Sequence, residues 1–454
     1  CVSSMVSDIE DCGVTLVSKT LACSADKLFE GNQVKQIQLS LLKWYDVARR
    51  RLPWRGDMPP FGVQDQVKAE VKIESAACNP AIVWQEQRQR VPPYFTWVSE
   101  IMCQQTRVET VIEYFLRWIK KFPTIEALAN ASEEDVNLMW SGLGYYRRAR
   151  FLHHGAKTVV ELHGGTLPSS VQELKAIPGI GDYTAGAIAS IAYAKPAPLV
   201  DGNVIRVLSR MKAVAGNAKN KHVVTLCWKL ARELVSAARP GDFNQSLMEL
   251  GATICKPTNP KCSQCPLSIH CAALAETKAP KLMKKPLVFD LAENDRERAI
   301  ARQVATSVTK YPLRVTKAPP KEEIWCVYVI VCEGKYLLLK RPNLGLLANQ
   351  WEFPSLPWFR EDQALPSYAC RQALINKFLD ENFGIKTNIN TVRVDLGVKE
   401  HVFSHRKHQM YVEKLQLSFK EGSHGMSLAR MQMDGGKECC WVDVVEMKVS
   451  TGDS

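Results

Sequence analysis

Four cysteines lie within one short stretch, residues 255–271, which reads CKPTNPKCSQCPLSIHC. They are Cys255, Cys262, Cys265 and Cys271, spaced C-x6-C-x2-C-x5-C. Four thiolates in one loop can surround a zinc ion or a cubic iron–sulfur cluster. Zinc sites usually contain two C-x2-C pairs, whereas this loop has one pair flanked by single cysteines on proline-rich arms. The spacing therefore favours a [4Fe–4S] cluster over zinc or free thiols.

Two acidic residues, Glu100 and Asp201, are candidates for catalytic carboxylates. Glu100 falls inside a predicted amphipathic helix among apolar neighbours, where an acid is costly to bury without a purpose. Asp201 directly precedes Gly202 and the start of a predicted helix in PLVDGNVIRVLSR. A helix N-cap is the simplest alternative for Asp201, and a surface acid is the simplest alternative for Glu100.

A glycine-rich turn joins two predicted helices in LKAIPGIGDYTAGAIASIA, residues 174–192. Pro178, Gly179 and Gly181 form a turn that exposes backbone N–H groups, and the helix starting near Asp182 adds the positive end of its dipole. Such a turn binds phosphate without reading a base. The alternative is a plain helix–turn–helix connection. The net charge of +12 suits a polyanionic partner, so we predict DNA binding without sequence preference.

The elements that must position these residues fall into two blocks. From about 94 to 254 the apolar spacing is helical, with Ser132 as a predicted N-cap and Gly164–Gly165 as a predicted helix end. Strand-like patterns begin at 324, with one helix between them at 367–384. We expect an all-α block followed by an α+β block, divided into four parts: a weakly ordered segment at 1–35, a helical domain at 36–275 with a flexible insertion at 57–92, a linker at 276–322, and a second domain at 323–454.

The bulk composition excludes several classes of protein. The chain has 454 residues, of which 46% are hydrophobic, enough for more than one core. No apolar run reaches the roughly 18 residues that span a bilayer, and the first residues do not resemble a signal peptide. We therefore expect an intracellular protein without disulfides. Because the sequence begins with Cys1, we expect the natural N-terminus to lie upstream.

Residues from about 36 to 272 resemble the MutY branch of the helix-hairpin-helix DNA glycosylases, the adenine DNA glycosylases. The matching motifs are LPWR, WVSEIMCQQTRV, GLGYYRRAR, IPGIGDYTAGAIASIA, VDGNVIRV, FNQSLMELGA and the cysteine loop. The resemblance implies a base-excision-repair enzyme with a [4Fe–4S] cluster. Its substrate would be adenine paired with 8-oxoguanine or guanine in double-stranded DNA. We expect a monomer in the nucleus, with the mitochondrion as a second compartment and other repair proteins as partners.

The resemblance also implies a role for each matched residue. Glu100 would be the general acid that protonates adenine N7, which requires the raised pKa that an apolar pocket can supply. Asp201 would stay ionised and stabilise the oxocarbenium ion, covalently or electrostatically. Tyr183 and Asn203 would orient the acid and the attacking group. The remaining matches would line the adenine pocket (Trp54, Gln245) or contact DNA and the lesion (Gln105, Thr106, Leu143, Tyr145, Pro178, Gly179, Gly181).

One position separates this branch from relatives that resemble endonuclease III. Those enzymes cleave the strand and carry a lysine in the hairpin where this chain has Tyr183. That lysine forms a Schiff base, which a tyrosine cannot do. The sequence therefore predicts a monofunctional glycosylase and argues against a bifunctional glycosylase for pyrimidine lesions.

Residues 324 to about 448 resemble the Nudix-like domain with which MutY enzymes recognise 8-oxoguanine. The resemblance assigns the contact with the oxidised base to Ser404, flanked by Phe403 and His405. A true Nudix hydrolase needs a helix with a run of glutamates to bind magnesium. The corresponding helix, YACRQALINKFLDENFG, lacks that run, so we do not expect pyrophosphate hydrolysis.

The chain departs from the family pattern in three places. The insertion at 57–92 lies near Trp54, so the alternative function is a catalytically impaired protein that binds 8-oxoguanine mispairs. Residues 276–322 contain no cysteine, so we expect no zinc site in the linker. The chain ends in STGDS without a sliding-clamp motif, and we expect the natural C-terminus to lie further on.

Overall fold

The structure is a computed structural model of the chain. It describes residues 28–62, 91–278, 291, 294–303, 306–314, 320–342, 347–359, 365–385, 391–403, 406–417, 431–432 and 438–443. These residues form two compact units, one within 1–51 and 182–314, the other within 52–62, 90–181 and 315–454. The stretch expected as one helical domain is therefore shared between the units. Most of the expected insertion at 57–92 lies outside the described residues.

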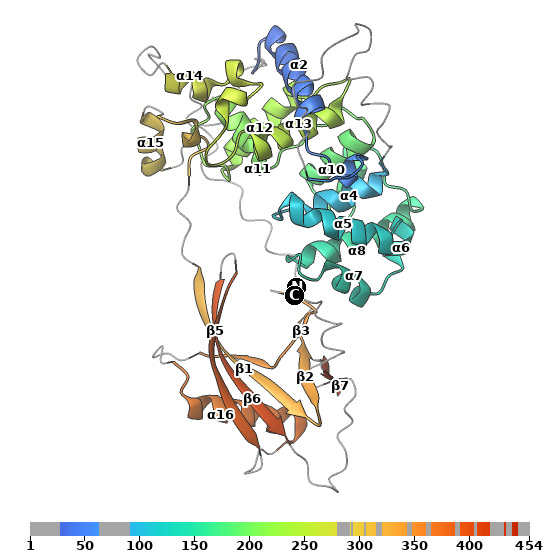
Figure 1. Cartoon of the computed structure of the whole chain (residues 1–454), viewed down its shortest axis with the longest axis vertical. Helices are drawn as coiled ribbons and strands as arrows, with labels where there is room; N and C mark the ends of the chain where they lie inside the picture. The colour runs from blue at the N-terminus through green and yellow to red at the C-terminus, as the bar shows by residue number, and fades with distance from the viewer. Residues whose placement is uncertain are drawn as a thin grey trace, which may run out of the picture. The chain divides into compact units, whose positions relative to one another are not determined.

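The first unit is helical (Figure 1). Its longer elements are α2 (Gly31–Ala48), α10 (Asp182–Ala187) with a π-helical turn (Ile188–Ala192), α11 (Gly202–Met211), α12 (Lys221–Leu234), α13 (Pro240–Thr253), α14 (Ala272–Lys278) and α15 (Asp295–Arg302). Helix α2 begins before the expected domain boundary at residue 36, so the expectation of weak order was wrong for residues 31–35. The reason is an apolar stripe: Ile37, Leu41 and Tyr45 recur at helical spacing and are fully buried.

The segment expected to be a linker is partly folded onto the first unit. Residues 295–302 form α15, and a 3₁₀ turn follows at Val308–Lys310. The Tyr311 side chain is fully buried, and its hydroxyl donates a 2.7 Å hydrogen bond to Glu276 on α14. Leu313 N–H donates to the Gly216 carbonyl at 2.9 Å. This segment therefore belongs to the core beside the cysteine loop. Its buried apolar side chains are irregularly spaced in the sequence, so this packing was not predicted.

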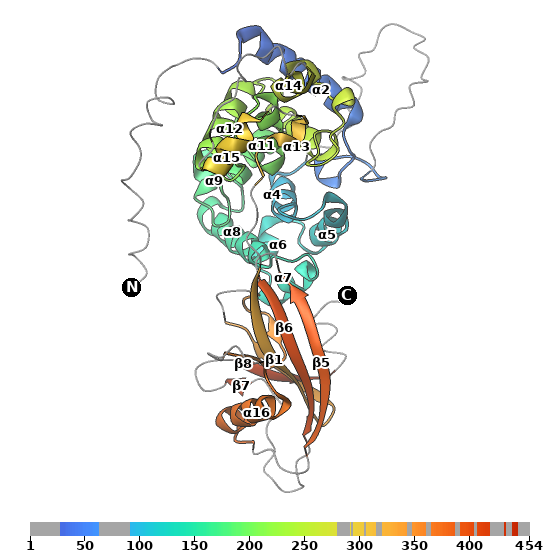
Figure 2. The ribbon, with the colours of Figure 1, turned by 90° about the vertical axis from the view of Figure 1, so that its left-hand side faces the viewer.

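The second unit contains a helical part that is visible in both ribbon views (Figure 2). It consists of a 3₁₀ turn (Pro53–Arg55), α4 (Pro93–Met102), α5 (Val108–Lys121), α6 (Ile125–Ala129), α7 (Glu133–Trp140), α8 (Arg147–His163) and α9 (Val171–Lys175). The Ser132 hydroxyl caps α7, and Gly164 ends α8 with a φ of 57°, both as predicted. No helix in the described part of the chain is long and apolar enough to cross a membrane.

The second unit also contains a mixed sheet. Its strands are β1 (Lys321–Cys332), β2 (Lys335–Lys340), β3 (Trp351–Glu352), β4 (Ser355–Pro357), β5 (Val392–Val402), β6 (Arg406–Leu417), β7 (Met431–Gln432) and β8 (Glu438–Val442). The order is β5-β6-β1-β2-β8-β7, with β1 and β6 parallel. Helix α16 (Tyr368–Phe383) packs Ile375 and Leu379 against the apolar side chains of the sheet. The predicted long strands and this helix are present, and the short strands β3, β4, β7 and β8 were missed.

Candidate functional site

Asp201 occupies the N-cap position of α11. Its Oδ1 accepts a 2.7 Å hydrogen bond from Val204 N–H, and its Oδ2 accepts a 2.8 Å bond from the Asn203 amide. Burial raises the pKa of Asp201, while these two donors and the charge of Arg206 act in the opposite direction. Asp201 is thus the N-cap of α11. It is also a buried carboxyl group whose ionised form is stabilised by Val204, Asn203 and Arg206.

Arg206 connects this carboxylate with the cysteine loop. Its Nη2 donates to Asn203 Oδ1 at 2.7 Å and to the Gly251 carbonyl at 2.8 Å. Its Nε donates to the Cys255 carbonyl at 2.8 Å. Sequence reasoning missed Arg206, although its place one helical turn after Asn203 was a usable signal. Helix α11 therefore carries an unbroken series of hydrogen bonds from Asp201 to the first cysteine.

The four cysteines line one small cavity together with Arg210, Ile254 and Val308. None of the four forms a disulfide, and burial raises the pKa of Cys265 to about 12 and that of Cys271 to about 11. Arg210 is almost fully buried, and its Nη1 lies 3.3 Å from Cys255 Sγ. Within the described residues, no three His, Cys, Asp or Glu side chains are placed to hold one metal ion. Four thiols around one cavity beside a buried guanidinium fit a cluster that is held as thiolates.

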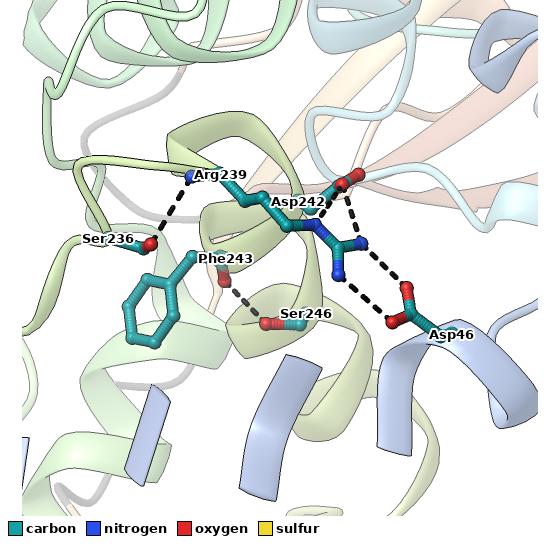
Figure 3. Close-up of polar contacts among 6 residues, drawn as sticks. All are labelled: Asp46, Ser236, Arg239, Asp242, Phe243 and Ser246. Atoms are coloured by element: carbon teal, nitrogen blue, oxygen red, sulfur yellow. Dashed lines mark hydrogen bonds and ion pairs between the residues drawn. The ribbon is translucent and has the colours of Figure 1, made fainter. Parts of the chain in front are cut away.

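Helix α13 carries Gln245, and two sets of ion pairs fix this helix against α2 and the residues that follow α2. Arg239, at the start of α13, donates to Asp46 of α2 at 2.6 and 2.9 Å and to Asp242 at 2.8 and 2.9 Å (Figure 3). Further along, the buried Glu249 accepts from the Arg50 backbone N–H at 3.1 Å and from its Nε at 2.8 Å. Gln245 itself is 9% exposed between these two anchors. The helix is therefore held rigidly on both sides of the predicted pocket residue.

The predicted hairpin is present between α9 and α10. Gly179 has a φ of 85°, and a Cβ there would lie 2.7 Å from the Phe151 Cβ, so only glycine fits. Ile180 N–H donates to the Ile177 carbonyl at 3.1 Å and closes the turn. After Gly181 the chain enters the first unit, where the Tyr183 hydroxyl donates to Met248 Sδ at 3.3 Å. Phosphate binding at this turn stays a prediction.

Glu100 lies in α4 of the second unit and is 9% exposed. Its helix neighbours Trp97 and Val98 are fully buried, so the expected apolar surroundings are present. Trp54, 7% exposed, packs edge to face on Phe115 at a ring distance of 5.3 Å. The placement of both residues agrees with the sequence prediction, and their roles remain predictions.

The residues of the second unit that the resemblance assigns to DNA contact lie on two loops. Gln105 and Thr106 follow α4, and Leu143 and Tyr145 precede α8. Arg148, which sequence reasoning missed, donates hydrogen bonds to both loops. Burial lowers the pKa of Arg148 to about 10, so it remains charged at neutral pH.

Phe403 lies at the end of the hairpin formed by β5 and β6. Its N–H donates to the Arg406 carbonyl at 2.8 Å, and its ring packs against His401 at 4.4 Å and His408 at 4.7 Å. The predicted residues Ser404 and His405 lie outside the described residues.

Comparisons with known proteins agree with these observations. Residues 98–233 match the HhH-GPD superfamily of base excision DNA repair proteins, and residues 326–450 match the NUDIX domain. Both parts of the predicted fold class are therefore confirmed. Curated relatives named adenine DNA glycosylase are 40% identical in Arabidopsis thaliana, 37% in Rattus norvegicus and 38% in Homo sapiens.

The alignments extend over most of this chain. They cover 88% of it for the plant protein, 92% for the rat protein and 84% for the human protein. The chain in turn spans 60% of the plant relative, 76% of the rat relative and 67% of the human relative. The chain belongs to the adenine DNA glycosylases, a family of base-excision-repair DNA glycosylases.

Proposed function

We propose that the protein hydrolyses the N-glycosidic bond of adenine in duplex DNA in which the adenine is paired with 8-oxoguanine or guanine. The observation that carries the proposal is the oriented carboxyl of Asp201, which accepts two hydrogen bonds at the N-terminus of α11. Similarity to proteins named adenine DNA glycosylase supports adenine as the base. The assignment of 8-oxoguanine as the base opposite adenine rests on the resemblance of the C-terminal domain to the Nudix-like domain of the family.

In the proposed reaction Glu100 protonates N7 of the extruded adenine. The bond between C1′ and N9 then breaks, and its electron pair leaves with the neutral adenine. Asp201 stabilises the positive charge that develops on the sugar, which is the usual task of a carboxylate in glycoside hydrolysis. Asn203 holds Asp201 in place, and Tyr183 orients the acid. Water then adds to C1′ and gives up a proton to the Glu100 carboxylate, which leaves an abasic site and restores the acid.

The product retains an intact strand, because Tyr183 supplies no amine for a Schiff base. The exposed hairpin glycines and the lysines of the cysteine loop, Lys256 and Lys261, suit contacts with phosphate. Cys255, Cys262, Cys265 and Cys271 would hold the [4Fe–4S] cluster, which supplies a rigid, charged centre to this loop. We propose that the protein acts as a monomer in the nucleus, with the mitochondrion as a second compartment.

The proposal is tested with duplexes that contain adenine opposite 8-oxoguanine, guanine or thymine under single-turnover conditions. We expect strand breaks only after alkali treatment, fastest opposite 8-oxoguanine and slowest opposite thymine. Breaks before alkali would show a bifunctional enzyme. Tight binding of the 8-oxoguanine duplex without base release would favour the second candidate, a lesion-binding protein whose insertion at 57–92 impairs catalysis.

A further inference from the structure

Arg148 lies at the start of α8 beneath two loops, which we call the wedge loops, residues 103–107 and 141–146. Its side chain is only 8% exposed. The guanidinium stacks 5.2 Å from the ring centre of Trp140 and 5.5 Å from that of Tyr145. A buried arginine loses hydration, and that loss must be offset by hydrogen bonds.

The guanidinium donates six hydrogen bonds, and all six go to these loops or to the end of α4. The acceptors of Nη1 are the carbonyl oxygens of Ile101 (3.0 Å), Met102 (2.8 Å) and Gln104 (2.6 Å). The acceptors of Nη2 are Thr106 Oγ1 (3.1 Å) and the carbonyl oxygens of Leu143 (3.2 Å) and Gly144 (3.0 Å). One side chain therefore ties together two loops that lie about forty residues apart in the sequence.

Each wedge loop holds a non-glycine residue in the left-handed region of backbone conformation. Gln105 has a φ of 57° and Tyr145 has a φ of 50°. Such residues persist only where the surrounding structure determines their conformation, and they concentrate at functional sites. Tyr145 is nevertheless 48% exposed, so burial of its own ring does not hold it in place. Arg148 bonds to the Gln104 carbonyl and the Thr106 hydroxyl, on either side of Gln105, and to the Leu143 and Gly144 carbonyl oxygens, directly before Tyr145. These bonds restrain the backbone at both residues.

We infer that Arg148 is a positioning residue that presets the wedge loops, so that Gln105 and Tyr145 can open the duplex and extrude the adenine. The inference rests on the proposed function and extends it to the base-flipping step. Arg148 acts through the loops and takes no part in breaking the glycosidic bond. Its loss therefore slows extrusion of the base and leaves the chemistry of an extruded base intact.

The experiment compares the wild-type protein with Arg148→Ala and Arg148→Lys on two duplexes. One duplex is fully paired around adenine opposite 8-oxoguanine, and the other has mismatched pairs flanking the adenine, which makes unstacking easy. We expect Arg148→Ala to excise adenine at least tenfold more slowly from the first duplex and within threefold of wild type from the second. Lysine retains the charge without the planar fork, so Arg148→Lys should recover only part of the loss.

Base extrusion is also read directly, from the fluorescence of 2-aminopurine placed beside the adenine. Arg148→Ala should bind the duplex and give a smaller rise in fluorescence than wild type. The matched control is Arg147→Ala, which removes the same charge from an exposed position one residue away. It should weaken DNA binding and lower its salt dependence, without changing the ratio of rates between the two duplexes.

Equal loss of excision on both duplexes would mean that Arg148 only maintains the fold and would overturn the inference. An unchanged rate on both would overturn it as well. If wild type excises adenine from neither duplex, the proposed function fails, and the fluorescence signal alone decides whether Arg148 governs base extrusion.

Discussion

Replacement of Arg206 with methionine tests the connection between Asp201 and the cysteine loop. Methionine has nearly the same length and keeps the apolar contacts of the side chain. It removes the guanidinium that donates to Asn203 Oδ1 and to the carbonyl oxygens of Gly251 and Cys255, at 2.7 to 2.8 Å. The substitution therefore deletes these three short hydrogen bonds, a long one of 3.5 Å to the Gly202 carbonyl, and one positive charge.

The expected cost in stability follows from these three acceptors. A hydrogen bond from a charged donor contributes about 1.5–3 kcal/mol when its acceptor is buried, and less where water can replace the donor. The Arg206 side chain is half-buried, so we expect a total loss of about 2–4 kcal/mol. At about 2–4 °C per kcal/mol, the melting temperature should fall by roughly 5–15 °C.

The same substitution should change the pH dependence of excision. Burial already raises the pKa of Asp201, and the charge of Arg206 acts against that rise. Without this charge the pKa rises further, so the ionised form that the reaction needs is lost at higher pH. The acid limb of the single-turnover rate should move to higher pH. The loss of stability should be larger at pH 8 than at pH 5, because Arg206 attracts Asp201 only when the carboxyl is ionised.

Two variants separate the causes. Arg206→Lys keeps the charge without the forked donors, so it should lose stability while its acid limb stays near that of wild type. Arg232→Met removes a charge from an exposed position on α12 and should change stability by less than about 0.5 kcal/mol. Thermal unfolding and rate–pH profiles are measured for all four proteins. An acid limb in Arg206→Met that coincides with wild type would refute the assignment of that limb to Asp201.

Three further substitutions test separate parts of the structure. Tyr311→Phe removes the donor to the buried Glu276 and should lower the free energy of unfolding by about 1–3 kcal/mol in urea denaturation; an unchanged midpoint would show that the segment after α15 is not anchored there. Gly179→Ala places a Cβ against Phe151 at a φ of 85° and should weaken binding to any duplex, measured by fluorescence anisotropy, whatever the base opposite adenine; an effect confined to the 8-oxoguanine duplex would contradict a phosphate contact. Arg239→Leu removes the guanidinium that bridges Asp46 and Asp242 and should cost about 3 kcal/mol by thermal unfolding; an unchanged melting temperature would show that these ion pairs do not hold α13.

Local signals in the sequence predicted much of the fold. Ser132 and Ser367 cap their helices, and Gly164 and Gly384 end theirs in the left-handed conformation. These signals are readable because each depends on a few neighbouring residues. For Asp201 the local signal is not sufficient. The same residue is the helix cap and the candidate catalytic carboxylate, so the cap pattern does not distinguish the two roles.

The partners of buried arginines could not be predicted. Arg148 and Arg206 bond to carbonyl oxygens that lie about four to fifty residues away, and any residue type can supply a carbonyl. The docked segment around Tyr311 was missed for a related reason. It buries isolated side chains at irregular spacing, so no helical or strand periodicity predicts its packing against the core.

The proposed role of Glu100 is tested by adenine release from the 8-oxoguanine duplex, measured in a single turnover for wild type and Glu100→Gln, with binding of both proteins measured in parallel. Glutamine keeps the shape of the side chain and cannot donate the proton. We expect release by wild type, a loss of at least about a hundredfold in Glu100→Gln, and similar affinity of both proteins for the duplex. Release by Glu100→Gln at the wild-type rate would contradict the role of Glu100 as the acid. Binding without release by wild type would contradict the proposed glycosylase activity.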